Sequence, residues 1–319
     1  MILDRVNANR NPFIYLNNMG KVMTSGGVVG MRGLARAAAT AAAIAGGAAA
    51  FPIGSEAQAE TGAWVESAHA KVRLVSAVAA TQGHQRVQLG LEIKLAPGWK
   101  TYWRTPGEGG MPPRFDWGGS ANLAAVAIAW PAPRRFEIGG MESVGYQDQV
   151  ILPLEVSLAR PGEPLSVRLQ LHYAVCREIC MLLESRLTLD LPAAAPASAE
   201  SLNNGEAIAR FQARVPRPGA EQGWSVTGVT VKQMGEGAER RSVIVVDVAA
   251  ADAGFAAPEV LIECPGVRFG KPVTKRGAES RHARFLAPMH GTATPGGDLV
   301  LTVIDGDRAA TFTVPAPAR

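Results

Sequence analysis

Apolar and polar residues alternate along several short segments of the chain, which is the pattern of strands with one buried face. From residue 87 to 95 every second residue is Val, Leu or Ile, and a similar period of two runs over 165–175 and 187–191. Gly and Pro separate these segments, and no convincing amphipathic helix interrupts them. The pattern predicts an antiparallel β-sandwich over residues 60–191.

The second half of the chain repeats this style after an Ala/Pro-rich stretch, residues 192–200, whose composition is typical of a semi-rigid linker. We expect residues 201–319 to form a second sandwich, with only residues 200–214 helical. Its strands are predicted at 243–248, 260–262, 299–304 and 309–314. The expected fold class is therefore all-β, with two sandwiches side by side.

Residues 31–59 follow the order of a secretory signal peptide. Two arginines precede an apolar stretch of small residues at 37–50, and Ala57-Gln58-Ala59 matches the A-x-A cleavage pattern. An Ala-rich buried helix is the alternative. We expect residues 1–59 to be an upstream extension and signal peptide, cleaved between Ala59 and Glu60, and the mature protein to be periplasmic.

Charge and composition exclude several classes of function. The whole chain carries a net charge of +4, and removal of the signal leaves basic and acidic residues nearly balanced. No basic stripe with interleaved aromatic residues occurs, so nucleic acid is not an expected partner. After residue 59 no apolar run approaches the roughly 18 residues that span a bilayer, and hydrolase motifs are absent. The mature protein is expected to be soluble.

The candidate chemistry lies in two cysteines, Cys176 and Cys180, between two predicted strands. A tight reversal there would bring their Cα atoms to the roughly 5.5–6 Å that a disulfide needs. Because so short a loop removes little entropy from the unfolded chain, stability alone explains the bridge poorly, whereas reversible thiol exchange explains it well. Cys176 shares a strand face with His172, opposite Tyr173, so we expect its sulfur to be accessible.

Two other interpretations of the pair remain open. A disulfide-stapled structural module is one, since such staples are common in exported domains. A periplasmic Cu(I)-binding, copper-tolerance protein is the other, because His172, Cys176, Cys180 and Met181 offer the soft ligands that Cu(I) accepts. Oxidation of the pair would prevent thiolate binding. The third cysteine, Cys264, is expected to be a buried free thiol, with an intermolecular bridge as the alternative.

Several short motifs follow one another over residues 65–192. They are Gly98-Trp99-Lys100-Thr101-Tyr102-Trp103-Arg104, Trp130-Pro131, Phe136, Gly145-Tyr146, Leu152-Pro153-Leu154, Tyr173 and the cysteine pair. Their order resembles the N-terminal domain of the DsbD thiol:disulfide interchange family, and most of all its ScsB-type members. The resemblance implies an immunoglobulin-like domain without a cofactor. Such a domain carries electrons from a membrane-embedded thiol reductase to periplasmic thioredoxin-like or disulfide-isomerase proteins.

The resemblance also implies a shielded site. In the family an aromatic residue on a cap loop covers the cysteines, and Phe136 stands at that position here. Tyr102, Trp103, Tyr146 and His172 are the candidate pocket residues.

The chain departs from the family pattern in three ways. The cysteines have three residues between them, fewer than in the best-known members, and Met181 follows Cys180 where a bulky residue and proline are common. The sequence contains neither a multi-span region nor a Cys-x-x-Cys thioredoxin-like tail, so we expect separate redox partners. The second sandwich carries no assignable motif, and a spacer or docking module is expected.

Overall fold

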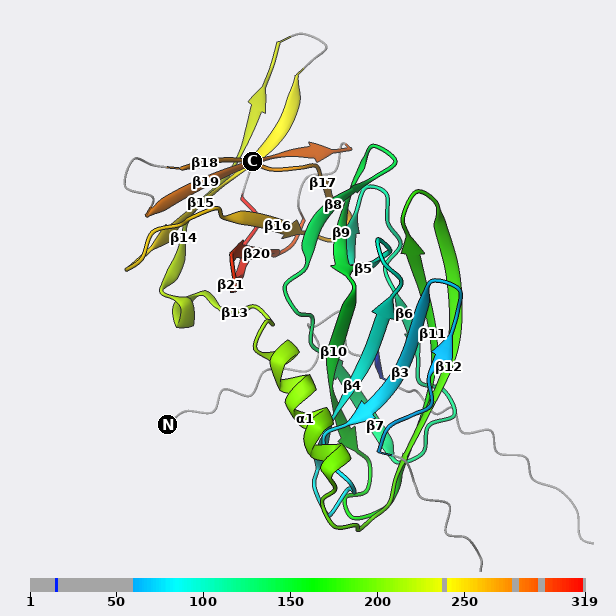
Figure 1. Cartoon of the computed structure of the whole chain (residues 1–319). Coiled ribbons are helices and arrows are strands. Elements are labelled where there is room, and N and C mark those ends of the chain that lie inside the picture. Colours follow the sequence, from blue (N-terminus) through cyan, green and yellow to red (C-terminus); the bar gives the residue numbers. More distant parts are fainter. Residues whose placement is uncertain (1–14, 17–59, 237–239, 277–280, 292–295, 318–319) are drawn as a thin grey trace, which may run out of the picture.

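The computed structural model describes two β-sandwiches and one α-helix (Figure 1). The residues that it describes are 15–16, 60–236, 240–276, 281–291 and 296–317. The predicted signal segment at 31–59 and its cleavage site lie outside the described residues. Within the described part, no helix is long and apolar enough to cross a membrane. The predicted all-β fold is confirmed.

The first sandwich consists of two antiparallel sheets. One has the order β1-β7-β10-β4-β3-β2, and the other has the order β12-β11-β5-β9-β8, with β6 also paired to β11. The strands of the first sheet are β1 (Tyr15–Leu16), β2 (Val65–Glu66), β3 (Ala70–Ser76), β4 (Arg86–Leu95), β7 (Leu123–Ile128) and β10 (Gln149–Leu158). Those of the second sheet are β5 (Lys100–Gly107), β6 (Arg114–Asp116), β8 (Arg134–Ile138), β9 (Met141–Gln147), β11 (Leu165–Cys176) and β12 (Cys180–Leu191).

The core of this sandwich follows from the alternation in the sequence. The apolar residues predicted to share one face of β4 and of β11 are buried, and their neighbours along each strand are largely more exposed. They pack with four tryptophans, Trp99, Trp103, Trp117 and Trp130, in one cluster between the two sheets. Burial of these side chains is the dominant favourable contribution to folding of this half.

The helix α1 (Ala199–Gln212) begins at a capping box formed by Ser198 and Ser201. Its buried residue Ile208 packs with Val75 and Ile151 on the outer side of the first sandwich. The helix therefore covers a sheet of the first sandwich, although the sequence grouped its residues with the second. Figure 1 shows α1 lying along that face, before the chain crosses to the second sandwich.

The second sandwich also pairs two sheets. They have the orders β13-β21-β20-β16 and β14-β15-β19-β17, with β18 also paired to β19. The strands are β13 (Arg217–Pro218), β14 (Trp224–Met234), β15 (Arg241–Ala250), β16 (Glu259–Glu263), β17 (Arg268–Phe269), β18 (Val273–Arg276), β19 (His282–His290), β20 (Leu299–Asp305) and β21 (Arg308–Val314). A short 3-10 turn, η1 (Gly219–Gln222), precedes β14.

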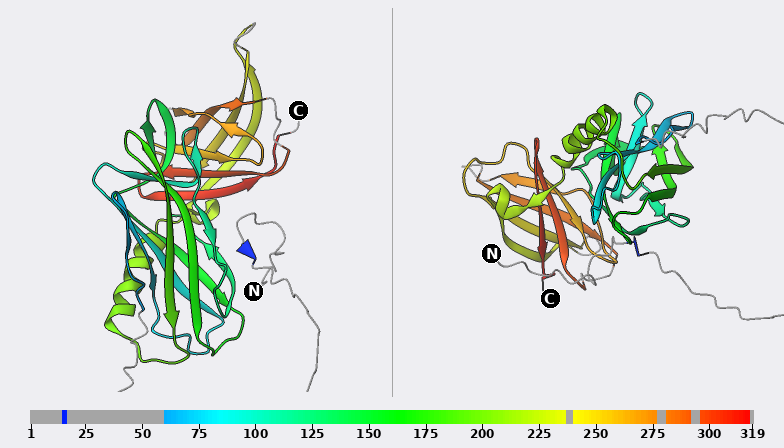
Figure 2. Two further views of the ribbon diagram at one scale, coloured as in Figure 1. Left: turned by 90° about the vertical axis from the view of Figure 1, so that its right-hand side faces the viewer. Right: turned by 90° about the horizontal axis from the view of Figure 1, so that it is seen from below.

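The two sandwiches are in contact. Leu261 of β16 is buried and belongs to the core cluster of the first sandwich, and Arg104 of β5 forms an ion pair with Glu263 of β16 at 2.7 Å. Figure 2 shows the second sandwich resting against one end of the first. The contact lies at the end of the first sandwich that carries β8 and β9, which is also the end where the cysteine pair lies.

Candidate functional site

The two cysteines face each other across the tip of the β11–β12 hairpin. Cys176 is the last residue of β11 and Cys180 the first of β12, and they form a cross-strand pair joined by a disulfide, with Cα atoms 4.2 Å apart. The backbone N–H of Arg177 donates to the carbonyl of Ile179 at 3.1 Å and closes the reversal. The predicted hairpin with a disulfide at its tip is therefore present.

The two sulfur-bearing residues differ in exposure. Cys176 is 0% exposed, whereas Cys180 is exposed. The difference follows from the strand order, because β11 lies between β5 and β12, and β12 is the last strand of its sheet. Cys176 faces away from the main core, as predicted, and lies in a separate small cluster with Tyr102. The expectation that its sulfur is accessible is wrong, since another part of the chain covers that face.

The covering part is a hairpin made of β8 and β9, called here the cap hairpin. Its turn is Gly139-Gly140, with φ of 58° and 79°, values that favour glycine at both positions of a tight hairpin turn. Phe136 and Ile138 of β8 pack against the cluster that holds Cys176. Phe136 lies where a shielding residue is expected, but on a strand rather than on the predicted loop.

Tyr102 lies directly against the disulfide. Its hydroxyl oxygen is 2.9 Å from Sγ of Cys176 and 3.3 Å from Sγ of Cys180. A disulfide sulfur has no proton to give, so the phenol is the donor in this oxidised form. Burial raises the pKa of Tyr102, and the hydroxyl of Ser143 opposes that rise. The phenol thus stays a proton donor throughout the neutral range.

The other three candidate pocket residues lie away from the sulfurs. Trp103 follows Tyr102 on the same strand, so its side chain points to the opposite face and is fully buried in the main core. Tyr146 is also in that core and donates to the carbonyl of Pro131 at 2.8 Å. His172 lies four residues before Cys176, about 13 Å along an extended strand. The sequence could not separate Tyr102 from these residues, because all of them are plausible linings of a strand-rich site.

The proposed copper ligands do not come together. His172 pairs with Glu184 across the hairpin, with 4.0 Å between Nδ1 and the carboxylate oxygen. Met181 is the cross-strand partner of Val175, one position from the disulfide. Among the described residues, no group of three or more His, Cys, Asp or Glu side chains is arranged to hold a metal ion. In this oxidised form the two cysteine sulfurs are bonded to each other and cannot act as thiolate ligands, so Cu(I) binding by the reduced pair stays a prediction.

The third cysteine, Cys264, is a free thiol in the second sandwich. It is half-buried rather than fully buried, and it packs at the edge of that sandwich's core. Burial raises the pKa of its thiol, so the thiolate form, which is the reactive nucleophile, is disfavoured. Cys264 takes no part in the Cys176–Cys180 bridge.

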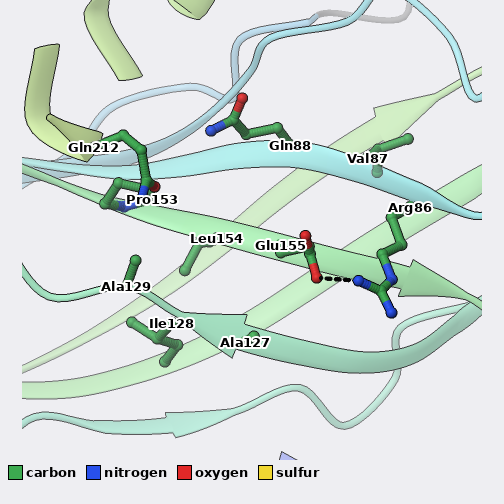
Figure 3. Close-up of a pocket in the computed structure, with 10 residues that line it drawn as sticks. All are labelled: Arg86, Val87, Gln88, Ala127, Ile128, Ala129, Pro153, Leu154, Glu155 and Gln212. Atoms are coloured by element: carbon green, nitrogen blue, oxygen red, sulfur yellow. Dashed lines mark hydrogen bonds and ion pairs between the residues drawn. The ribbon is translucent and has the colours of Figure 1, made fainter. Parts of the chain in front are cut away.

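A pocket of about 520 Å³ lies elsewhere, on the outer face of the first sandwich beside the end of α1 (Figure 3). Arg86 and Glu155 form an exposed ion pair there, with N and O atoms 2.9 Å apart. Gln212 of α1 and aliphatic residues of β4, β7 and β10 complete the lining. The lining residues of this pocket include no cysteine or histidine, so the pocket is separate from the cysteine site.

The fold and site define a class: a β-sandwich domain with a shielded disulfide at the tip of one hairpin. Residues 70–192 match the family model described as thiol:disulfide interchange protein DsbD, N-terminal, and residues 214–319 match a domain of unknown function, DUF8393. The match covers the first sandwich, which is therefore similar to DsbD N-terminal domains. No curated protein matches the chain.

One solved structure has the same architecture over both sandwiches. It is the N-terminal periplasmic domain of ScsB from Proteus mirabilis, with a TM-score of 0.63 and 24% sequence identity. The similarity covers 81% of this chain and 99% of that one, more than either sandwich alone could account for. The second sandwich is thus part of the shared fold.

Proposed function

We propose that the protein is a periplasmic thiol–disulfide exchange component. In this proposal the Cys176–Cys180 pair accepts electrons from a membrane-embedded thiol reductase and passes them to periplasmic thioredoxin-like or disulfide-isomerase proteins. The observation that carries the proposal is the disulfide itself, with one exposed and one buried cysteine under a separate hairpin. The similarity of the first sandwich to DsbD N-terminal domains and the periplasmic location of the similar ScsB domain support it.

The exposure of the two residues assigns their roles. A donor thiolate reaches Cys180, forms a mixed disulfide with its sulfur, and releases Cys176 as a thiolate that the Tyr102 hydroxyl can hydrogen-bond. The second thiol of the donor then attacks the donor's first sulfur in the mixed disulfide, and Cys180 is released. The pair ends as two thiols and the donor as a disulfide, with two electrons and two protons transferred. Exchange with an acceptor runs the same steps in reverse.

The test compares two single-cysteine variants in a Cys264→Ser background, which removes the unrelated thiol. Cys176→Ser should accumulate a mixed disulfide with a thioredoxin-like partner, because the remaining Cys180 is exposed and has no resolving thiol. Cys180→Ser should form roughly tenfold less, because Cys176 is fully buried. Non-reducing gels and mass spectrometry of the trapped species give the yield and identify the partner. Equal, low yields from both variants would contradict the proposal.

A purely structural staple is the second candidate, and the reduction potential separates it from exchange. Structural disulfides in exported proteins lie below about −300 mV, and exchanging pairs lie above that value. Equilibration in glutathione or dithiothreitol buffers, followed by alkylation and mass spectrometry, measures the potential. Export is tested by fractionation of the native host and N-terminal sequencing, for which the expected first residue is Glu60.

A further inference from the structure

The two faces of strand β8 contact different parts of the molecule. Phe136 and Ile138 pack toward Cys176 on one face. Arg135 immediately precedes Phe136 in the strand, so its side chain leaves the opposite face. There its guanidinium donates to the backbone carbonyl of Val260, in β16 of the second sandwich, at 2.5 Å. One short strand therefore joins the cover of the disulfide to the second sandwich.

Carboxylates on both sides reinforce this link. Arg135 forms ion pairs with Glu142 of β9, within the cap hairpin, and with Glu259 of β16 at 3.4 Å. The side chains of Arg135 and Glu142 are 16% and 18% exposed, so their pair is poorly screened by solvent, whereas Glu259 is 54% exposed. Arg135 thus braces the two strands of the cap hairpin and ties them to the second sandwich.

A second link holds the other border of the site. Glu108, just after β5, pairs with His290 of β19 in the second sandwich, with 3.0 Å between the carboxylate oxygen and Nε2. Three residues further on, Met111 packs against the cluster that contains Cys176. The segment that carries Glu108 and Met111 therefore also contacts both the second sandwich and the cysteine cluster.

Apolar contacts fill the space between these links. On the face of the cap hairpin opposite the cysteine cluster, Arg135, Glu142 and Val144 line a small cavity of about 40 Å³. Leu261 and Phe269 of the second sandwich line the same cavity. Leu261 is 5% exposed and packs in the first core. The second sandwich therefore lies directly against the cap hairpin.

We infer that the second sandwich positions the cap over the disulfide and so sets how readily Cys180 and Cys176 are reached, with Arg135 as the main positioning residue. The inference assigns a role to a domain for which neither its sequence nor its family gives one, and its functional meaning rests on the proposed exchange reaction. Opening of the cap then requires the loss of contacts to the second sandwich as well as those to the cysteine cluster.

The experiment measures the rate at which dithiothreitol reduces the Cys176–Cys180 bridge in the full chain, read by alkylation and mass spectrometry. Each event yields two cysteine thiols and the cyclic disulfide of the reductant. Arg135→Met keeps the apolar stem and removes the contacts to Glu142, Glu259 and the Val260 carbonyl, so the rate should rise about fivefold or more as the open population grows. Arg134→Met is the matched control, because Arg134 is an exposed neighbour on the same strand. It should stay within about twofold of the parent rate.

A second variant alters only the second sandwich. Glu259→Gln combined with His290→Gln should raise the rate about twofold or more, because it weakens both links from the far side. His282→Gln, at the exposed opposite end of β19, is its control. The double variant replaces surface residues, so it decides the question even if Arg135→Met fails to fold.

The outcomes separate the explanations. An effect of Arg135→Met with none from the double variant would mean that the ion pairs to Glu259 and His290 do not hold the cap, and the inference would be wrong. Unchanged rates in both variants would also overturn it. Altered dithiothreitol rates with no exchange toward any thioredoxin-like protein would instead support the positioning role and reject the proposed function.

Discussion

At the scale of single residues, the two halves of the disulfide have different surroundings. Cys176 is enclosed by Tyr102, Ile138 and Ala174, whereas Cys180 begins an edge strand and is exposed. The Tyr102 hydroxyl lies within hydrogen-bonding distance of both sulfurs. Hydrogen bonds to a charged acceptor are worth about 1.5–3 kcal/mol, so this phenol matters most when Cys176 becomes a thiolate.

Tyr102→Phe should therefore slow reduction of the disulfide by roughly tenfold, since the released Cys176 thiolate loses its donor while the ring still fills the cluster. The rate with dithiothreitol, measured at constant pH, checks this. Burial raises the pKa of Tyr102, so the phenol should keep donating up to and beyond its ordinary range, and the wild-type to variant ratio should be constant between neutral pH and about pH 9.

Tyr146→Phe is the matched control for this variant. Tyr146 packs in the main core and donates to the carbonyl of Pro131, and its hydroxyl makes no hydrogen bond to either sulfur among the described residues. Its loss should lower the free energy of unfolding by about 1 kcal/mol and leave the reduction rate unchanged. An equal slowing in both variants would show that the rate does not depend on the hydrogen bonds from the Tyr102 hydroxyl to the sulfurs.

At the scale of elements, the sequence was informative where one face of a strand is buried and the other is solvated. The alternation predicted β4 and β11 closely, and the helix expected at 200–214 is observed at Ala199–Gln212. Strand β12 begins at Cys180, well before the alternating segment 187–191. The cap hairpin was missed as a pair of strands because the alternation in Arg135-Phe136-Glu137-Ile138 spans only four residues, the shortest length at which such a pattern indicates a strand. One face of β8 contacts the cysteine cluster, and the other contacts the second sandwich. Contacts between distant segments decide that pattern.

The site was predicted unevenly for a similar reason. Local spacing was enough to predict the pairing of Cys176 with Cys180, and the family resemblance indicated Phe136. The choice of Tyr102 over Trp103 depends on which face of β5 meets the disulfide, and therefore on the register between β5 and β11. Neighbouring residues alone do not set that register.

A glycine makes the close approach of β5 and β9 possible. A Cβ atom at Gly145 would lie 1.9 Å from the backbone carbonyl oxygen of Thr101. Because Thr101 belongs to the paired strand β5, its carbonyl cannot move aside without breaking the pairing. Gly145→Ala should therefore force β9 away from β5 and lower the free energy of unfolding by about 3 kcal/mol or more. Urea unfolding followed by tryptophan fluorescence measures the change.

Gly205 in α1 provides the opposite case. A Cβ there would meet Ala77 at an ordinary 3.7 Å, and alanine is favoured over glycine inside a helix by about 0.5–1 kcal/mol. Gly205→Ala should stabilise the protein by that amount. Destabilisation of similar size in both variants would contradict the packing described for β5, β9 and α1.

At the scale of the whole molecule, tyrosine ionisation distinguishes the two sandwiches. Tyr102, Tyr146 and Tyr173 all lie in the first sandwich, and burial raises the pKa of each. A folded-state pKa above the ordinary value of 10.0 means that stability is retained below that pH and is lost as pH rises further. The second sandwich, over residues 214–319, contains no tyrosine.

The first sandwich should therefore unfold cooperatively above pH about 10, with tyrosinate absorbance and loss of its tertiary signal appearing together. Stopped-flow pH jumps followed by tyrosinate absorbance check this. A smooth titration centred on pH about 10 without unfolding would mean that the phenols are accessible to solvent, contrary to their burial.

The two sandwiches should also depend on each other for stability, because Leu261 completes the first core and Glu263 accepts two hydrogen bonds from Arg104, at 2.7 and 3.0 Å. Both partners of this ion pair are less than 20% exposed, at 17% and 12%. Removing one charge from such a pair is costly, because its partner was placed to meet it. Glu263→Gln keeps the shape of the side chain and removes its charge.

We expect the wild-type protein to unfold in one calorimetric transition and Glu263→Gln to unfold in two, with a loss of about 2 kcal/mol in the coupling between the sandwiches. Glu155→Gln is the matched control, since Glu155 is 55% exposed in its ion pair with Arg86 inside the first sandwich and such pairs contribute less than about 1 kcal/mol. If Glu263→Gln kept a single transition at the wild-type temperature, the sandwiches would not be coupled through this pair. The shared position of Leu261 would then have to account for any joint unfolding.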